Sequence, residues 1–283
     1  MKLKSIVLAG LSAGVMASAN AFILFPGTNL LEDDNREYLI KGAGNTQAGV
    51  LEQGDRLRGV IEFQAINQET APFSVQDPIT PELTGIFETE VVSIIPSATA
   101  GIASVIVFGP SASFTSVYGA NATVAIFEGG SNLVINSCAS IADCETAATD
   151  GTHLLTAGFG DVDDAWISLN ARLNFGAASS LGSTTPVADI SYAQTILVNN
   201  SPYIFNQVSL DCQSVGGPFL CAEDGKTDLV GSGRIFGGAG LTNGYGVRSD
   251  IDVTINVVPE PGSLALVGLA LAGIGLSARR RKA

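Results

Sequence analysis

Strict alternation of apolar and polar residues in two stretches constrains the fold more than any other feature of this sequence. In residues 165–175 every odd position is apolar, and in residues 247–257 most odd positions are apolar while the even positions are polar. Successive side chains of a strand point to opposite faces of a sheet. Each stretch therefore predicts a strand that covers a core with its odd-numbered face.

The rest of the sequence also favours an all-β domain. Helical periodicity is weak except at 140–148, and no repeat of fixed length is visible. Residues 22–45 and 68–81 are expected to be loops. Many short strands separated by Gly-rich turns favour one antiparallel β-sandwich, jelly-roll-like in topology. The further predicted strands, rich in β-branched or aromatic residues, are 57–66, 86–95, 102–108, 122–127, 189–198, 203–210 and 229–236.

The first 21 residues have the organisation of a secretory signal peptide. Two lysines lie among the first four residues, residues 6–16 are apolar, and Ala19-Asn20-Ala21 fits an A-x-A cleavage site. The competing interpretation, a buried N-terminal helix, requires a polar face that this apolar run lacks. We expect a mature chain that begins near Phe22 and works outside the cytoplasm.

The four cysteines agree with export. Cys138 and Cys144 form one local pair, and Cys212 and Cys221 form a second. An even number of cysteines in an exported protein favours disulfides, whereas a zinc site requires histidines or C-x₂-C spacing. Within one helix Cys138 and Cys144 would lie about 240° apart around the axis. A bond between them therefore requires a turn.

The C-terminal residues 259–283 predict a transmembrane helix. From Pro261 onward, 18 residues carry no charge, and as a helix they would measure about 27 Å, close to a hydrocarbon core of about 30 Å. The basic cluster Arg279, Arg280, Arg281 and Lys282 favours the cytoplasmic side. The rest of the chain then lies on the exported side, as the signal peptide also requires. A permanent anchor with no further role fits the hydropathy as well.

The order of Pro259-Glu260-Pro261, an apolar helix and an Arg-rich end resembles the PEP-CTERM sorting signal of Gram-negative bacteria. This resemblance implies that exosortase, a membrane enzyme, recognises Pro259, Glu260 and Pro261 and cuts near them. The inner membrane then holds the precursor only transiently, and the product reaches the cell surface or extracellular matrix. The family is associated with exopolysaccharide, biofilm and floc. Because the resemblance is confined to 259–283, it concerns sorting and leaves 22–258 as the exported domain.

Charge excludes nucleic acid as a partner of that domain. Residues 22–258 contain 8 basic and 26 acidic residues, a net charge of −18. Binding to nucleic acid depends on basic residues that neutralise phosphates. We therefore expect no nucleic-acid binding.

Few residues offer catalytic chemistry or metal ligands. His153 is the single histidine, and its position after a turn favours a surface or structural role over a Ser-His-Asp triad. Asp161, Asp163 and Asp164 can gather oxygen ligands for Ca²⁺, although the loop lacks EF-hand spacing and fits a solvated acidic turn as well. We expect no catalytic residues and no cofactor apart from this possible calcium.

These observations favour a non-enzymatic exported protein with a structural or adhesive role in exopolysaccharide. The alternative is a carbohydrate-binding module, which requires an exposed aromatic platform. Trp166 is the main candidate because it lies on the even, polar side of its predicted strand; Tyr118, Tyr203 and Tyr245 are the others. Packing of Trp166 under a loop is the competing interpretation. A secreted hydrolase is the third alternative: many acidic pairs exist, and no motif selects one.

Overall fold

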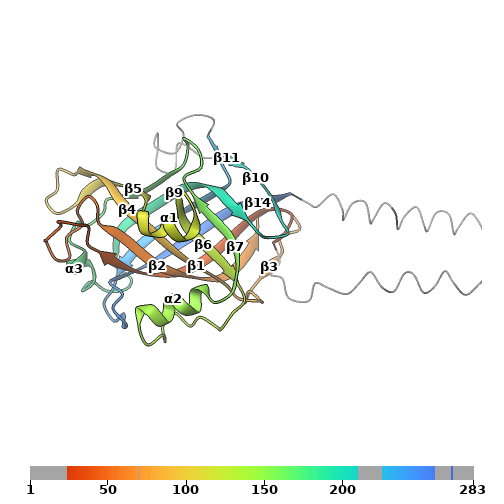
Figure 1. Cartoon of the computed structure of the whole chain (residues 1–283), viewed down its shortest axis with the longest axis horizontal. Coiled ribbons are helices and arrows are strands. Elements are labelled where there is room, and N and C mark those ends of the chain that lie inside the picture. Colours follow the sequence, from red (N-terminus) through yellow and green to blue (C-terminus); the bar gives the residue numbers. More distant parts are fainter. Residues whose placement is uncertain (1–23, 70, 210–224, 259–268, 270–283) are drawn as a thin grey trace, which may run out of the picture.

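The computed structural model describes residues 24–69, 71–209, 225–258 and Leu269 (Figure 1). Its elements, in chain order, are β1 (Gly27–Ile40), β2 (Arg56–Gln68), β3 (Val75–Gln76), β4 (Leu83–Pro96), β5 (Ala103–Pro110), α1 (Ala112–Tyr118), β6 (Ala122–Glu128), α2 (Ile141–Thr149), β7 (Thr152–Gly158), β8 (Ala165–Leu169), α3 (Phe175–Ala178), β9 (Pro186–Asn199), β10 (Ile204–Asn206), β11 (Val208–Ser209), β12 (Lys226–Thr227), β13 (Leu229–Gly237) and β14 (Val247–Val258).

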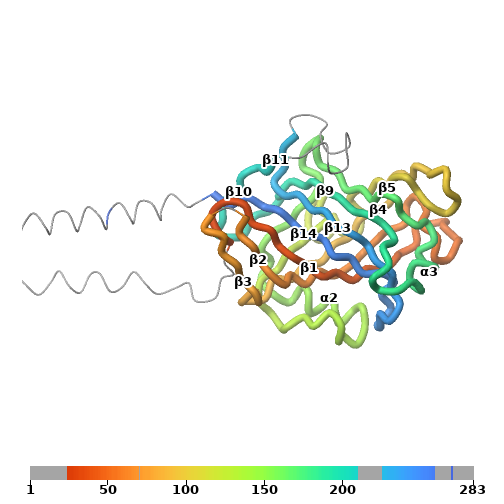
Figure 2. Tube along the Cα trace, turned by 180° about the vertical axis from the view of Figure 1, so that it is seen from behind, coloured from red at the N-terminus to blue at the C-terminus, as the bar shows by residue number. Residues whose placement is uncertain are grey.

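Most strands belong to one antiparallel sheet that closes on itself. β1 lies between β2 and β14, and the sheet continues through β13 to β9. β9 then pairs with β8 along one part of its length and with β7 along another. β4 is shared in the same way by β5 and β6, and it also pairs with β2. The path from β2 through β14, β9, β7, β6 and β4 therefore returns to β2 (Figures 1 and 2).

This architecture confirms the antiparallel all-β prediction but not the two separate sheets of a jelly-roll-like sandwich. The walls that face each other across the core are parts of one continuous sheet. Alternation reports that one face of a strand is buried, and both arrangements bury one face. The sequence pattern therefore could not distinguish them.

Most of the interior is apolar, and two helices cover the outside. The main core cluster lies within the closed sheet and draws residues from nearly every long strand, among them Ile61, Phe87 and Val253. Outside, Phe114 of α1 packs on Phe127 of β6, and α2 contacts β2 and β4 (Figure 1). Both helices therefore fix the outer face around β2 and β4.

Most predicted elements are confirmed within a few residues. The segments predicted around β2, β4, β5, β6, β9 and β13 are strands, and the helix predicted at 140–148 is α2. β14 has its odd positions inside, as expected: Val247, Ile251 and Val253 are buried. Between 68 and 81 the expected loop contains only the two-residue strand β3. At 203–210 the predicted single strand is two short ones, β10 and β11.

The stretch 165–175 is a correction. Strand β8 ends at Leu169, and Asn170 adopts a left-handed conformation with φ of 53°. All three central residues of β8 are buried, but the even position Trp166 belongs to the main core cluster and the odd position Ile167 does not; after the turn the odd position Ala171 joins that cluster. A single left-handed residue reverses which positions face inward, so the predicted orientation was wrong for β8.

The largest omission is β1, which lies in a segment predicted to be a loop. Its inward side carries Asp33, Asn35 and Glu37, all buried. Polar residues at inward positions remove the apolar alternation on which strand prediction depends. The sequence pattern therefore did not reveal β1, although it is a central strand.

Both chain ends of the domain lie at the same end of the closed sheet. Gly27, where β1 begins, is the register partner of Val257 near the end of β14. The predicted signal peptide, the Cys212–Cys221 pair and nearly all of the sorting segment lie outside the described residues. Among the residues that are described, no helix is long and apolar enough to cross a membrane.

Candidate functional site

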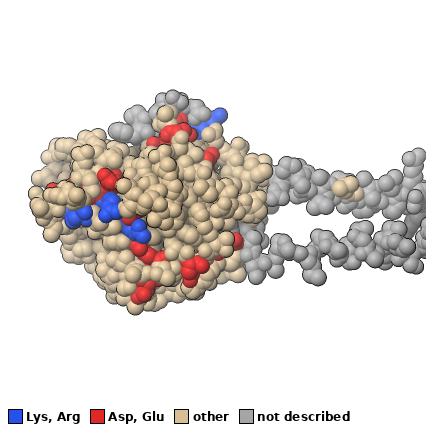
Figure 3. Space-filling model, in the orientation of Figure 1, with Lys and Arg blue, Asp and Glu red and all other residues tan. Residues whose placement is uncertain are grey.

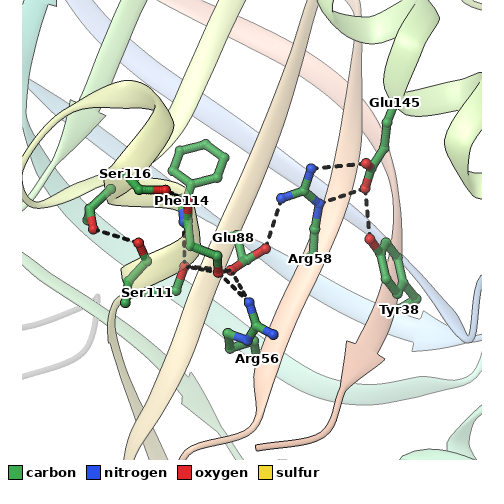
Figure 4. Close-up of polar contacts among 11 residues, drawn as sticks. Tyr38, Arg56, Arg58, Glu88, Ser111, Phe114, Ser116 and Glu145 are labelled. Carbon is green, nitrogen blue, oxygen red and sulfur yellow. Dashed lines mark hydrogen bonds and ion pairs between the residues drawn. The ribbon is translucent and has the colours of Figure 1, made fainter.

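A buried carboxylate organises the outer face between α1 and α2. Glu88 of β4 has 1% of its side chain exposed and accepts hydrogen bonds from Arg56 and Arg58 of β2, both at 2.9 Å (Figure 4). Burial alone would raise the pKa of Glu88, but its hydrogen bonds to Ser111, Ser113 and the two arginines hold it below 4.5. Glu88 is therefore a stable anion at neutral pH.

Arg58 links this carboxylate to α2. Its guanidinium also donates to both carboxylate oxygens of Glu145, at 2.6 and 2.9 Å. Tyr38 of β1 donates its hydroxyl hydrogen to the same group at 2.8 Å (Figure 4). Burial lowers the pKa of Arg58, but the bonds to Glu145 and Glu88 outweigh it and raise the pKa above its ordinary value. Helix α2 is thus bound to β1 and β2 by charge-assisted hydrogen bonds.

The carboxylate of Glu88 also holds α1 in place. Ser111, the N-cap of α1, accepts a hydrogen bond from the backbone amide of Phe114 at 3.1 Å and donates to Glu88 at 2.5 Å. Ser113 also donates to Glu88. Because every group in this network is engaged with a neighbour, its role is to position the helices and Tyr38.

An open groove lies beside this network at the end of the domain opposite the chain ends. The 238–246 loop between β13 and β14 forms one wall, and the groove has a volume of about 510 Å³. Small-molecule sites commonly occupy about 300–1,000 Å³. We call it the outer groove, and its lining includes Tyr38, Lys41, Phe175, Ser179, Thr242 and Tyr245.

Two tyrosines of the outer groove lie against each other. The rings of Tyr38 and Tyr245 meet edge to face with centroids 6.1 Å apart. Tyr38 is half-buried and Tyr245 is 7% exposed. Because Tyr38 is also held by Glu145, the outer groove has a rigid floor.

A smaller pocket of about 150 Å³ adjoins the outer groove, and the charged residue that lines this pocket is Arg36. Arg36, with 4% of its surface exposed, donates to Asp34 at 2.5 and 3.2 Å and to Asn136 at 2.7 Å. Lys41 is likewise paired with Glu52 and Asp55. The basic groups of the groove therefore carry no surplus positive charge.

This arrangement suits hydroxyl-rich, uncharged ligands. Thr242 and Asn136 are exposed at its rim and offer polar groups. The two tyrosines contribute their apolar rings, because the Tyr38 hydroxyl is bonded to Glu145 and the Tyr245 hydroxyl is buried. On the face of the domain that Figure 3 shows, basic side chains gather in a short row with acidic ones beside them. The outer groove and the adjoining pocket therefore offer aromatic rings and polar side chains at an open surface.

The prediction that Trp166 forms a ligand platform was wrong. Its side chain is 2% exposed and lies inside the closed sheet, with ring centroids 5.6 Å from Phe87 and 4.8 Å from Tyr192. The reversal at Asn170 explains the error, because it places the even positions of β8 inside. Trp166 is a core residue.

The other candidate aromatics separate in the structure. Tyr118 packs on Phe114, with centroids 4.5 Å apart, and the hydroxyl of Tyr203 accepts a hydrogen bond from the amide of Leu24. Only Tyr245 of the predicted set lines the outer groove. Sequence reasoning missed Tyr38, because it falls within the segment predicted to be a loop.

The three aspartates of the 159–164 turn mostly accept hydrogen bonds from the protein itself. Asp164 accepts from the amides of Gly160 and Asp161 at 2.5 and 3.0 Å and from Thr195 at 2.8 Å. Burial raises its pKa. Asp163 accepts from the amide of Gly225 at 3.1 Å. Within the part of the chain that is described, no three acidic, histidine or cysteine side chains are placed to share a metal ion.

His153 and the cysteine pair Cys138 and Cys144 contribute to packing and to covalent structure. The His153 ring lies 5.3 Å from Phe127 and contacts Thr156 through Nε2 at 2.9 Å. Cys138, before α2, is bonded to Cys144 within it, which confirms the predicted disulfide and turn.

The sorting motif follows directly from the last strand of the domain. Strand β14 is paired along its length and ends at Val258. Residues 257–282 match the family model described as the PEP-CTERM protein-sorting motif. The chain carries a PEP-CTERM sorting signal. No curated protein and no solved structure gives a significant match.

The PEP-CTERM motif fixes the route of the protein. It identifies an exported chain that is bound transiently to the membrane and has exosortase as its processing partner. The residues predicted for this role, Pro259, Glu260 and Pro261, fall within the matched segment.

Proposed function

We propose that this exported protein is a non-enzymatic component of the extracellular matrix that adheres to polysaccharide through the outer groove. The groove is the observation that carries this proposal: it is open, has a rigid tyrosine floor, and lies at the end of the domain away from the sorting motif. A ligand bound there does not obstruct processing.

The balance of charge favours a neutral polysaccharide. Arg36 and Lys41 are each paired with carboxylates, and the exported domain has a net charge of −18 from 8 basic and 26 acidic residues. An anionic polymer would be repelled by this field. A neutral glycan is not subject to this repulsion.

A role as a secreted hydrolase has less support. The single histidine packs between Phe127 and Tyr118, and Glu88 and Glu145 share Arg58. Hydrolysis of a glycosidic bond uses two carboxyl groups that flank the substrate. The carboxylates of Glu88 and Glu145 both accept hydrogen bonds from Arg58, which lies between them, so they do not flank a site for substrate.

A groove-filling substitution tests the proposal. Thr242→Trp places a large ring at the exposed rim of the outer groove, and Thr99→Trp makes the same change at an exposed loop outside it. Using immobilised neutral glucans, mannans and galactans, we expect Thr242→Trp to weaken retention of the processed domain about tenfold, or about 1.4 kcal/mol. The Thr99→Trp variant should bind as the unmodified protein does. Equal retention of both variants would contradict a role for the groove, and release of sugars with turnover would favour a hydrolase.

A further inference from the structure

Three exposed apolar side chains surround the place where the chain leaves the domain. Phe73 is 68% exposed, Val75 is 63% exposed and Ile204 is 51% exposed. Val75 lies on β3 opposite Asn67, and Ile204 lies on β10 opposite Val258. We call these three residues the exit rim.

The strand register puts the exit rim at the end that carries both chain termini of the domain. From β3 the sheet passes through β2, β1 and β14 to β10, and the central pair in this series joins Gly27 to Val257. The exit rim therefore flanks the first and last strands on both sides (Figure 2). Large exposed apolar side chains grouped around one feature mark an interaction site.

The length of the connecting chain limits how far this end can lie from the bilayer. Five residues, 259–263, separate Val258 from Leu264, where the uncharged apolar stretch begins. Five extended residues span at most about 18 Å. The headgroup region on one side of a bilayer occupies about 5–7 Å of that distance. The exit rim is thus held within about one strand length of the lipid.

We propose that the exit rim rests on the lipid surface, at the boundary of headgroups and acyl chains, while the sorting segment is attached. Apolar side chains at this boundary are stabilised by removal from water. Glu32 and Glu69 are exposed at the same end, so the rim suits zwitterionic rather than anionic lipid. This contact presents the Pro-Glu-Pro motif in the thin layer next to the membrane, where a membrane enzyme can reach it. Contact of the exit rim with lipid and binding of polysaccharide in the outer groove are independent of each other.

Quenching by brominated lipid tests the contact in the full-length precursor. Phe73→Trp puts an indole on the exit rim, and Ile95→Trp puts one at a 41% exposed position on β4 at the opposite end of the domain. Each variant is reconstituted in phosphatidylcholine vesicles with bromines on the acyl chains, and the signal of buried Trp166 is subtracted. Near-ultraviolet circular dichroism verifies that each variant is folded.

The proposal predicts at least about a twofold loss of the added emission for Phe73→Trp and no loss for Ile95→Trp, because only groups at the acyl boundary reach the bromines. Since exosortase is absent from these vesicles, contact with the enzyme cannot produce the effect. Emission from Phe73→Trp that is unquenched, or equal quenching of both variants, overturns the proposal.

Discussion

Ser249 on β14 donates its hydroxyl hydrogen to the carboxyl group of Glu37 on β1 inside the closed sheet. Asp33, on the same inward side of β1, accepts from the backbone amide of Ile251 at 3.0 Å. Burial raises the pKa of Glu37 from 4.5 to about 8 and raises that of Asp33 well above 3.8. At neutral pH the core therefore contains Glu37 mainly in its uncharged form.

This arrangement predicts that the domain loses stability as pH rises. Between pH 4.5 and about 8 the folded chain keeps a proton on Glu37 that the unfolded chain has released. Ionisation of Glu37 in the unfolded chain should lower the free energy of unfolding by up to about 1.4 kcal/mol for each pH unit in this range. Above about pH 8 Glu37 should add nothing further to the slope. Urea unfolding at a series of pH values measures the slope.

Glu37→Gln should flatten that slope, because the amide stays uncharged and still accepts the hydrogen bond from Ser249. Glu69→Gln, at an exposed carboxylate, is the matched control and should leave the slope unchanged. A slope that is the same in all three proteins would show that Glu37 ionises in the folded state as it does in water.

The same residues explain why β1 escaped sequence prediction. Neighbouring strands such as β14 follow the apolar alternation, and their boundaries were predicted closely. In β1 the inward positions are occupied by Asp33, Asn35 and Glu37, whose burial depends on partners far along the chain, such as Ser249 and Ile251. A pattern within one segment cannot report those partners.

Removing Arg58 should destabilise the domain strongly. Arg58→Ala deletes the hydrogen bonds to Glu145 and Glu88 and leaves Glu88, 1% exposed, with one fewer compensating cation. We expect a loss of about 2–4 kcal/mol in the free energy of unfolding and faster amide exchange in α2. Arg234→Ala removes an exposed ion pair with Asp189 and should cost at most about 1 kcal/mol. Equal effects of the two changes would mean that the network does not hold α2.

Reduction of the Cys138–Cys144 disulfide should lower the melting temperature. Opening a loop of this length costs about 2 kcal/mol in a chain-entropy account, which corresponds to about 4–8 °C for a domain of this size. The Cys138→Ser, Cys144→Ser double variant should reproduce the effect without reductant. An unchanged melting temperature in the double variant would contradict a stabilising role.

Calcium removal should leave the domain unchanged. The carboxylates of Asp163 and Asp164 already accept hydrogen bonds from amides and Thr195, so a cation would have to displace those donors. We expect the melting temperature to shift by less than about 1 °C between EDTA and millimolar Ca²⁺. A rise of several degrees with Ca²⁺, lost in an Asp161→Asn variant, would restore the calcium site suggested by the sequence.

The candidate site was predictable only in part. Tyr245 could be named from the sequence only as one of several candidate aromatics, and Tyr38, which forms the groove floor with it, was not named. Trp166 was assigned to the wrong face, since the left-handed conformation of Asn170 interrupts the alternation at a residue type that tolerates it without requiring it. The outer groove itself depends on how the 238–246 loop meets β1, and no local pattern encodes that meeting. The PEP-CTERM motif was recognisable from the sequence, and the family model matches it at residues 257–282, because a sorting motif is a contiguous segment.

Exosortase should separate the folded β-domain from its PEP-CTERM segment after export. Intact-mass and peptide mass spectrometry of protein recovered outside cells that contain exosortase tests it most directly. We expect a chain that begins near Phe22, ends near the Pro-Glu-Pro motif and lacks Leu264–Ala283, with the uncleaved form accumulating in the membrane when exosortase is deleted. Extracellular protein that still carries Leu264–Ala283 would contradict it.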